Sequence, residues 1–329
     1  MTAAAILVTG GAGYIGSHVC KALAVKGYKP VTYDNLSRGN RSAVKWGPLE
    51  IGDLADQPRL RAVLAKYQPA AVMHFAAYSY VGESVEQPAL YYQNNVGGST
   101  SLIDAIVETQ IVPVIFSSTC ATYGVPERTP ISEDHPQRPI NPYGFSKLVI
   151  ERMLAEAKAT HGLRSLSLRY FNAAGADPDG EIGEAHEPET HLIPRVLMAA
   201  RDRAAITVYG NDYPTPDGTC IRDYVHVADL ANAHILALED MLAGGASGAL
   251  NLANARGHSV MEVIETARLE CGADIRVEVA PRRPGDPPIL VGAAERARAR
   301  LGWSPQRSAL AMQIEDAWRW IKSKGTRKS

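Results

Sequence analysis

The sequence lacks the closely spaced cysteine pairs that zinc sites and redox motifs use. Its four cysteines, Cys20, Cys120, Cys220 and Cys271, lie far apart along the chain. This pattern excludes a disulfide framework and a cysteine zinc site, and it favours reduced thiols in a cytoplasmic protein. We therefore predict no metal site.

A strong excess of one charge and long apolar runs are also missing. The formal net charge is −1 over 329 residues, so no basic field favours nucleic acid or a membrane surface. No apolar run reaches the roughly 18 to 20 residues that cross a bilayer. The N-terminus has no charged region before its first apolar strand, which leaves no room for a signal peptide. We expect a cytoplasmic protein that binds neither nucleic acid nor membrane.

Short β-branched runs alternate with helical stretches in the first half of the chain. Strands are predicted near residues 6–8, 31–33, 71–75, 114–116 and 165–168, with helices near 14–26, 88–108 and from 143 onward. Apolar runs without strict alternation are typical of strands buried on both faces. The α/β pattern predicts a Rossmann-type, doubly wound parallel sheet.

The pattern changes after about residue 172, where glycine and proline become frequent and loops lengthen. We predict a nucleotide-binding domain over residues 1–172 and a smaller mixed α/β substrate domain over 173–329. The boundary is open, because segments 224–227 and 250–252 can return to the first sheet.

A glycine motif follows the first predicted strand and opens the first helix. Gly10 permits a tight turn, Gly13 lets the backbone approach a pyrophosphate, and Gly16 lets the helix pack closely on the strand. Asp34 ends the second strand, where a carboxylate accepts both adenosine ribose hydroxyls and repels a 2′-phosphate. The motif predicts NAD as cofactor.

Two nearby charges allow more than one interpretation. Arg38 can in principle bind a phosphate, but the presence of Asp34 favours a loop charge. Asp53 ends another short strand, where it can contact the adenine, cap the next helix, or do both.

Tyr143 and Lys147 lie four residues apart and so share one helical face. Free tyrosine has a pKa of about 10, too high for a base at neutral pH. The nearby ammonium, together with a positively charged nicotinamide, would lower that pKa. Such pairs are common by chance, but here residues 117–119 (Ser-Ser-Thr) end the preceding strand, where a reacting oxygen of a substrate would lie.

Taken together, these motifs resemble an extended short-chain dehydrogenase/reductase, and more narrowly the UDP-glucose (UDP-galactose) 4-epimerases. The similarity runs from Ile6 to Trp320 and includes His74-Phe75-Ala76-Ala77 and Arg169-Tyr170-Phe171-Asn172. It implies an isomerase of carbohydrate (galactose) metabolism that interconverts UDP-glucose and UDP-galactose through a 4-keto intermediate, using bound NAD. It also implies a homodimer that pairs the helix near residues 99–108 with the helix carrying Tyr143.

The resemblance also implies roles for individual residues. Tyr143 would be the base and acid, Lys147 would lower its pKa, and Thr119 would bridge the sugar 4-oxygen. The cofactor contacts would be Gly10, Gly13, Tyr14, Ile15, Gly16, Asp34, Asn35, Asp53, Leu54, Phe75, Ala76, Ala77, Asn94, Ser117, Tyr143, Lys147 and Tyr170. The substrate contacts would be Thr119, Asn172, His191, Leu192, Thr207, Tyr209, Arg222, Arg283, Asp286 and Leu290. Chemistry independently supports the two arginines, since guanidinium groups bind a diphosphate bidentately.

Several positions depart from the best-known members of the family. His191 stands where an asparagine often contacts UDP, and Leu290 occupies a gate position that decides whether N-acetyl sugars enter. Tyr78 and Tyr80 are similar to a pattern in plant UDP-arabinose (UDP-xylose) 4-epimerases, or else pack beside the cofactor. A UDP-pentose substrate therefore stays an alternative.

Two other functions are disfavoured. Related 4,6-dehydratases and decarboxylating synthases place acidic residues just after the strand-end threonine, whereas this chain has Cys120 and Ala121. A non-catalytic NAD sensor would have no need of Thr119, Tyr143 and Lys147 together.

Overall fold

Seven parallel strands form the central sheet of the protein, whose computed structural model describes residues 3–283 and 285–325. Their order is β10-β6-β5-β4-β1-β2-β3. Their bounds are β1 (Ala5–Thr9), β2 (Lys29–Asp34), β3 (Leu49–Ile51), β4 (Ala71–His74), β5 (Val114–Thr119), β6 (Ser165–Tyr170) and β10 (Gly248–Leu252). The predicted Rossmann-type parallel sheet is confirmed.

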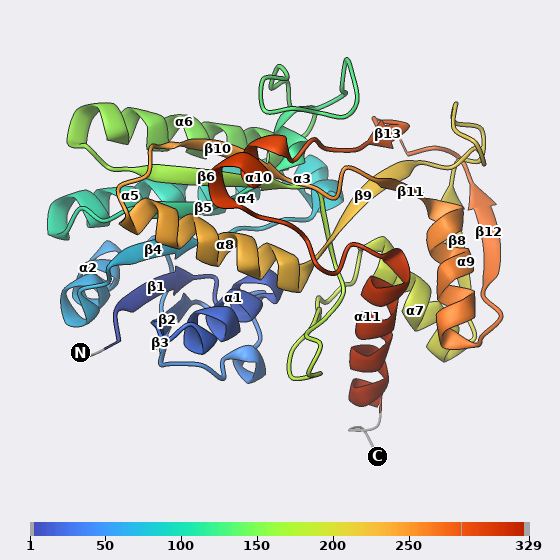
Figure 1. Ribbon diagram of the computed structural model, residues 1–329, viewed down its shortest axis with the longest axis horizontal. Coiled ribbons are helices and arrows are strands. Elements are labelled where there is room, and N and C mark those ends of the chain that lie inside the picture. Colours follow the sequence, from blue (N-terminus) through green and yellow to red (C-terminus); the bar gives the residue numbers. More distant parts are fainter. Residues whose placement is uncertain (1–2, 284, 326–329) are drawn as a thin grey trace.

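Helices cover both faces of this sheet (Figure 1). One layer contains α1 (Tyr14–Val25), α8 (Val227–Leu242) and α10 (Glu295–Leu301), and the other contains α2 (Gln57–Tyr67), α5 (Gly98–Thr109) and α6 (Pro142–His161). In β1, Ile6 and Val8 pack with the first layer while Leu7 packs with the second. Both faces of the strand are buried, which explains why its apolar run shows no alternation.

A π turn interrupts the helix predicted over residues 88–108. It is built as α4 (Pro88–Tyr91), the π turn η2 (Tyr92–Gly97) and α5, and it follows α3 (Val81–Glu86). The turn buries Asn95, whose Nδ2 donates to Ser146 Oγ at 3.1 Å and whose Oδ1 accepts from the Tyr78 backbone. Such turns recur at functional sites, and this one borders the cleft described below.

A second core lies in the C-terminal half of the chain, to the right in Figure 1. Strands β7 (Asn172–Ala174), β11 (Gly257–Ser259) and β13 (Ile289–Leu290) pair with β9 (Ile221–His226), and β8 (Ala205–Tyr209) pairs with β12 (Arg276–Ala280). Helices α7 (Leu192–Asp202), α9 (Val260–Cys271) and α11 (Leu310–Gly325) pack with them. The short 3-10 turns are η1 (Arg41–Ala43) and η3 (Cys120–Thr122).

Only one of the two segments left open by the sequence returns to the first sheet. Residues 250–252 belong to β10, the edge strand beside β6, whereas residues 224–226 belong to β9 in the second sheet. Residues 1–2, 284 and 326–329 of the two predicted domains lie outside the described part.

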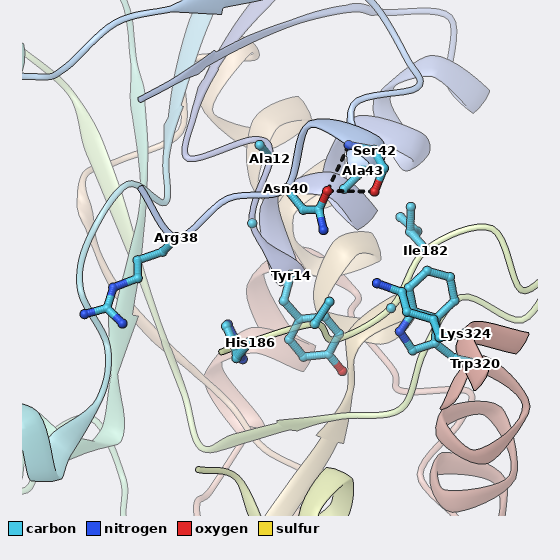
Figure 2. Close-up of a pocket in the computed structure, with 13 residues that line it drawn as sticks. Ala12, Tyr14, Arg38, Asn40, Ser42, Ala43, Ile182, His186, Trp320 and Lys324 are labelled. Carbon is cyan, nitrogen blue, oxygen red and sulfur yellow. Dashed lines mark hydrogen bonds between the residues drawn. The ribbon is translucent and has the colours of Figure 1, made fainter. Parts of the chain in front are cut away.

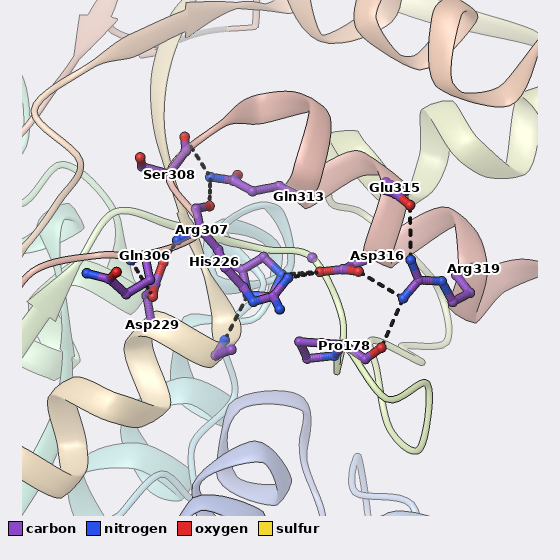
Figure 3. A network of polar contacts seen from close by, with 12 residues as sticks. Pro178, His226, Asp229, Gln306, Arg307, Ser308, Gln313, Glu315, Asp316 and Arg319 are labelled. Atoms are coloured by element: carbon purple, nitrogen blue, oxygen red, sulfur yellow. Dashed lines mark hydrogen bonds and ion pairs between the residues drawn. The ribbon is translucent and has the colours of Figure 1, made fainter.

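A buried polar network attaches α11 to the rest of the protein (Figure 3). Asp316 on α11 contacts His226 Nε2 at 3.1 Å, Arg307 Nη1 at 2.9 Å and Arg319 Nη1 at 3.2 Å. Burial by itself would raise the pKa of Asp316, but the contacts with His226 and the arginines hold it below its ordinary value. Arg319 also donates to the Pro178 carbonyl, so the network fixes the loop that leads towards the cleft.

All four cysteines are free thiols. Among the described residues, no helix is both long enough and apolar enough to cross a membrane.

Candidate functional site

A cleft of about 1500 Å³ opens at the carboxyl ends of the central strands, between the sheet and the C-terminal core. Ligands of open α/β sheets bind at this edge. A pocket for one small ligand typically measures about 300–1,000 Å³, so this cleft has room for two nucleotides. Every residue predicted to contact the cofactor or the substrate lines it.

The glycine loop has the backbone that the motif predicts. Gly10 has φ +74°, and a Cβ added there would lie 2.5 Å from the Ala76 backbone nitrogen. A Cβ at Gly16 would lie 2.3 Å from the Gly10 carbonyl oxygen, so the close packing of helix on strand requires glycine. Gly13 caps α1 and faces the cleft. The first turn of α1 thus offers free backbone N–H groups to an anion.

Asp34 is held rigidly at the end of β2. Its Oδ2 accepts from the Ala12 backbone at 3.0 Å and its Oδ1 from Leu36 at 2.8 Å. Burial raises the pKa of this carboxyl, and the two hydrogen bonds oppose that effect. Asp53 does not cap α2, because Asp56 does so. The capping interpretation of Asp53 was wrong.

Arg38 lines the cleft, but its guanidinium is already paired with side chains of the protein. Its guanidinium contacts Glu83 at 2.5 Å and lies 5.1 and 5.2 Å from the ring centroids of Tyr78 and Tyr80. The expectation that Arg38 is a loop charge rather than a phosphate ligand agrees with this geometry.

Tyr143 and Lys147, the pair predicted to be reactive, lie at the start of α6. Asn141 caps this helix by accepting from the Gly144 backbone at 2.8 Å. Lys147 is 2% exposed, and its Nζ donates to the Ser117 carbonyl at 2.7 Å. The same ammonium lies 6.0 Å from the centroid of the Tyr143 ring. Phenol and ammonium therefore line the same part of the cleft.

Burial dominates the acid–base properties of this pair. It raises the pKa of Tyr143 to about 12, which a hydrogen bond with Thr119 opposes. It lowers the pKa of Lys147 to about 7, which the charge of Glu151 opposes. The protein's own groups therefore leave the pKa of Tyr143 raised, because burial outweighs the hydrogen bond with Thr119. The predicted lowering also invoked a positively charged nicotinamide, and that charge would act in the lowering direction.

A buried network of hydrogen bonds and one ion pair lies next to Tyr143 and Lys147, and it was not predicted from the sequence. Glu151 follows Lys147 by one helical turn and accepts from Ser118 Oγ at 2.5 Å and from Arg169 Nε at 2.9 Å and Nη2 at 2.5 Å. Arg169 also donates to the Tyr123 hydroxyl. The network anchors α6 to the strand ends of β5 and β6. The spacing 143, 147, 151 was the available signal, since it places all three residues on one helical face.

The residues predicted to contact the nucleotide line the opposite wall. Arg222 on β9 contacts Asp286 Oδ1 at 2.7 Å, and the Arg283 guanidinium lies 4.0 Å from the Tyr209 ring centroid. Asn172 Nδ2 donates to the Asp223 carbonyl at 3.0 Å. Two guanidinium groups at one end of the cleft make that end suited to a diphosphate.

The two positions after Thr119 carry no acid. Burial raises the pKa of the Cys120 thiol to about 12, so the thiol stays neutral near pH 7. Ala121 has no titratable group. Neither position supplies a group that ionises near pH 7.

A second group missed in the sequence lies where the glycine loop meets the segment 184–191. Tyr14 and His186 lie close together there, beside a small pocket that Trp320 also lines (Figure 2). Glu184, His186, Glu189 and His191 form a cluster in this segment. Burial would lower the pKa of His191, but its hydrogen bonds with the two carboxylates raise it to about 10.

Comparison with known proteins agrees with this geometry. Residues 6–253 match the NAD dependent epimerase/dehydratase family. UDP-glucose 4-epimerase of Rhizobium meliloti is 52% identical over 316 residues, or 96% of each chain, and that of Rhizobium leguminosarum bv. trifolii is 51% identical over 97% of this chain and 98% of its own.

Solved structures are also similar to this chain over nearly its whole length. UDP-glucose 4-epimerase from Brucella ovis in complex with NAD is 55% identical, with a TM-score of 0.94 over 96% of this chain and 98% of its own. The Stenotrophomonas maltophila enzyme, with bound NAD and formylated UDP-arabinopyranose, is 37% identical, with a TM-score of 0.95 over 99% of this chain and 100% of its own. The chain belongs to the NAD dependent epimerase/dehydratase family.

Proposed function

We propose that the protein is an NAD-dependent 4-epimerase that interconverts UDP-glucose and UDP-galactose. One observation carries the proposal: Tyr143, Thr119 and Lys147 line the same cleft as the glycine loop and Asp34, with two arginines on the far wall. The relatives at 51–52% identity, which are UDP-glucose 4-epimerases, support it.

The residues of the glycine loop fit NAD. Positions 10 and 16 leave no space for a side chain, and the N-terminus of α1 suits a pyrophosphate. Asp34, fixed by two backbone hydrogen bonds, is placed to accept ribose hydroxyls. When bound, NAD supplies an acceptor for the C4 hydride and returns that hydride later.

Tyr143 would remove the proton of the sugar 4-hydroxyl and later return it to the 4-oxygen of the inverted sugar. Thr119 would bridge the phenol and the 4-oxygen. Lys147, held by the Ser117 carbonyl, would place a positive charge beside the ionised phenol. General acid–base catalysis of this kind typically contributes about 10²–10⁴-fold to the rate.

Inversion requires the oxidised sugar to rotate and present its other face while its nucleotide stays bound. Arg222 and Arg283 would hold the diphosphate, with Asn172, His191, Leu192, Thr207, Tyr209 and Asp286 around the rest of UDP, and Leu290 beside the sugar. Residues 1–172, with β10 returning to their sheet, would bind the cofactor, and residues 173–329 the nucleotide sugar. The neutral Cys120 and Ala121 support epimerisation without elimination.

Replacing Tyr143 by Phe tests the assignment. Tyr143→Phe is expected to lower turnover of UDP-galactose by at least about 10²-fold while UDP binding stays unchanged, because only the transferable proton is lost. Tyr28→Phe, outside the cleft, is the matched control and should keep full turnover. Near-normal turnover of Tyr143→Phe would overturn the assignment.

A second experiment tests the choice of sugar. UDP-galactose, UDP-N-acetylgalactosamine and UDP-arabinopyranose are supplied separately, and the products are resolved by anion exchange. We expect conversion of the hexose. The pentose belongs in the test because the Stenotrophomonas maltophila structure holds a UDP-arabinopyranose derivative. Conversion of the pentose alone would replace UDP-hexose by UDP-pentose as the substrate.

We also propose that the protein is a cytoplasmic homodimer. Phe145 on α6 is exposed and contacts Tyr92 at the π turn, which supports pairing through this face. The four free thiols support a reducing compartment. Light scattering of the purified protein would show a monomer mass if the pairing is wrong.

A further inference from the structure

We propose that Glu184, His186, Glu189 and His191 bind a divalent transition-metal ion of the Zn²⁺ class at the wall of the cleft. Their four ligand atoms all lie within 4.8 Å of one another. The cysteine spacing predicted no metal site, but the Glu-x-His-x-x-Glu-x-His spacing was overlooked. The proposal does not rest on the epimerase activity. The cluster engages His191 through Nδ1, so the contact with UDP proposed for His191 would use Nε2 of the same ring.

The donor atoms are already close to the arrangement that Zn²⁺ requires. Glu184 Oε1 lies 2.9 Å from His186 Nδ1 and 2.7 Å from His191 Nδ1, and Glu189 lies 2.9 Å from His191 Nδ1 and 3.8 Å from His186 Nδ1. Zn²⁺ binds nitrogen and oxygen at about 2.0–2.2 Å, so tetrahedral donors lie about 3.3–3.6 Å apart. These four contacts lie within about 1 Å of that spacing.

The charge of the cluster favours a cation. The side chains of Glu184 and Glu189 are only 8% and 5% exposed, and the ion pairs that the described residues give them come from His186 and His191. Buried carboxylates are stable when they are paired or coordinate a metal. A divalent ion would balance the charge of both carboxylates.

The negative charge of the neighbouring cluster, formed by Asp177, Asp179 and Glu181, is balanced in a different way. Lys21 Nζ lies 2.8, 2.6 and 2.7 Å from these three carboxylates and so provides their counter-charge. In the cluster of Glu184, His186, Glu189 and His191, imidazole nitrogens lie beside the carboxylates instead of a lysine ammonium. Two imidazoles and two carboxylates form a donor set suited to Zn²⁺, whereas Mg²⁺ and Ca²⁺ prefer oxygen ligands alone.

The ligands are also held in place by their surroundings. Glu189 Oε1 accepts from the backbone nitrogens of Thr190 and His191, each at 2.8 Å, and these bonds fix the carboxylate. Trp320 Nε1 donates to the Glu184 carbonyl at 2.8 Å. The Tyr80 ring lies 5.7 Å from His186 and 6.2 Å from His191. Such outer contacts orient metal ligands and reduce the ordering cost of binding.

The test titrates the EDTA-treated, tag-free protein with Co²⁺ alone and then with Zn²⁺. One equivalent of Co²⁺ should give the intense visible absorption of a four-coordinate site with histidine ligands, and Zn²⁺ should abolish it. The double variant His186→Ala/His191→Ala should bind Co²⁺ at least about 100-fold more weakly. Glu189→Gln, a milder change, should weaken binding at least about tenfold.

Two control variants separate this site from general metal binding. Glu181→Gln alters the lysine-filled cluster and His258→Ala removes a histidine outside the cleft, and both should keep the wild-type titration. Zn²⁺ should also raise the melting temperature of the wild type but not of the double variant, because a ligand of the folded state stabilises it. Absence of saturable absorption at one equivalent would overturn the proposal. So would equal affinity in wild type and in a correctly folded Glu189→Gln variant.

Discussion

Glu151→Gln would show how much the buried network behind the reactive pair contributes to stability. The side chains of Glu151 and Arg169 are only 9% and 7% exposed, and they share two hydrogen bonds. Glutamine keeps the shape but removes the charge, and its amide NH₂ faces a guanidinium that has only donors. Breaking a buried ion pair on one side typically costs about 3–5 kcal/mol, because the remaining charge stays buried.

We expect the lower end of that range, about 3 kcal/mol, since Arg169 keeps its contact with the Tyr123 hydroxyl and one amide oxygen. This loss corresponds to about a hundredfold change in the unfolding equilibrium. Urea denaturation at pH 7, followed by circular dichroism, measures it. Asp202→Asn breaks the exposed pair with Arg201 and is the control, with an expected loss below about 1 kcal/mol. If Glu151→Gln loses no more than this control, the network does not carry a buried charge.

Three further outcomes follow from single contacts. Lys147→Met should raise the free energy of unfolding by roughly 2–4 kcal/mol at pH 6, since burial lowers the lysine pKa from 10.5 to about 7. That gain should shrink as the pH rises from about 7 to 10.5, and a gain constant with pH in urea titrations contradicts the burial argument. Gly10→Ala should reduce NAD binding at least about tenfold, because its Cβ would collide with the Ala76 backbone; unchanged NAD content after purification would refute this. Asp316→Asn should cost about 1–3 kcal/mol by weakening the contact with buried His226, and a melting temperature equal to wild type would show that the network does not stabilise α11.

The central sheet and the cofactor loop were predictable because their signals are local. Strands buried on both faces need uninterrupted apolar runs, and the loop needs glycines at fixed positions whatever the distant chain does. The same holds for Tyr143 and Lys147, whose spacing alone places them on one helical face. Thr119 was predictable because it ends the neighbouring strand.

Other features depend on residues far apart in sequence, and no local sequence pattern predicts them. Residues 250–252 complete the first sheet only because the chain returns to β6 after the second core has formed. Arg38 loses its availability to a phosphate only because α3 brings Glu83 against it.

The sequence by itself determined the fold class and the cofactor motif, and it indicated the candidate reactive residues, since each of these signals lies within one strand, turn or helix. Only the tertiary structure decided in which direction the pKa values of the buried groups shift and which charged side chains pair with each other. Burial is a property of the packed whole, and it moves the pKa of Tyr143 up and that of Lys147 down. The convergence of Glu184 and His191 with their neighbours likewise exists only in the folded chain, where the surroundings hold the backbone of residues 184–191 in place.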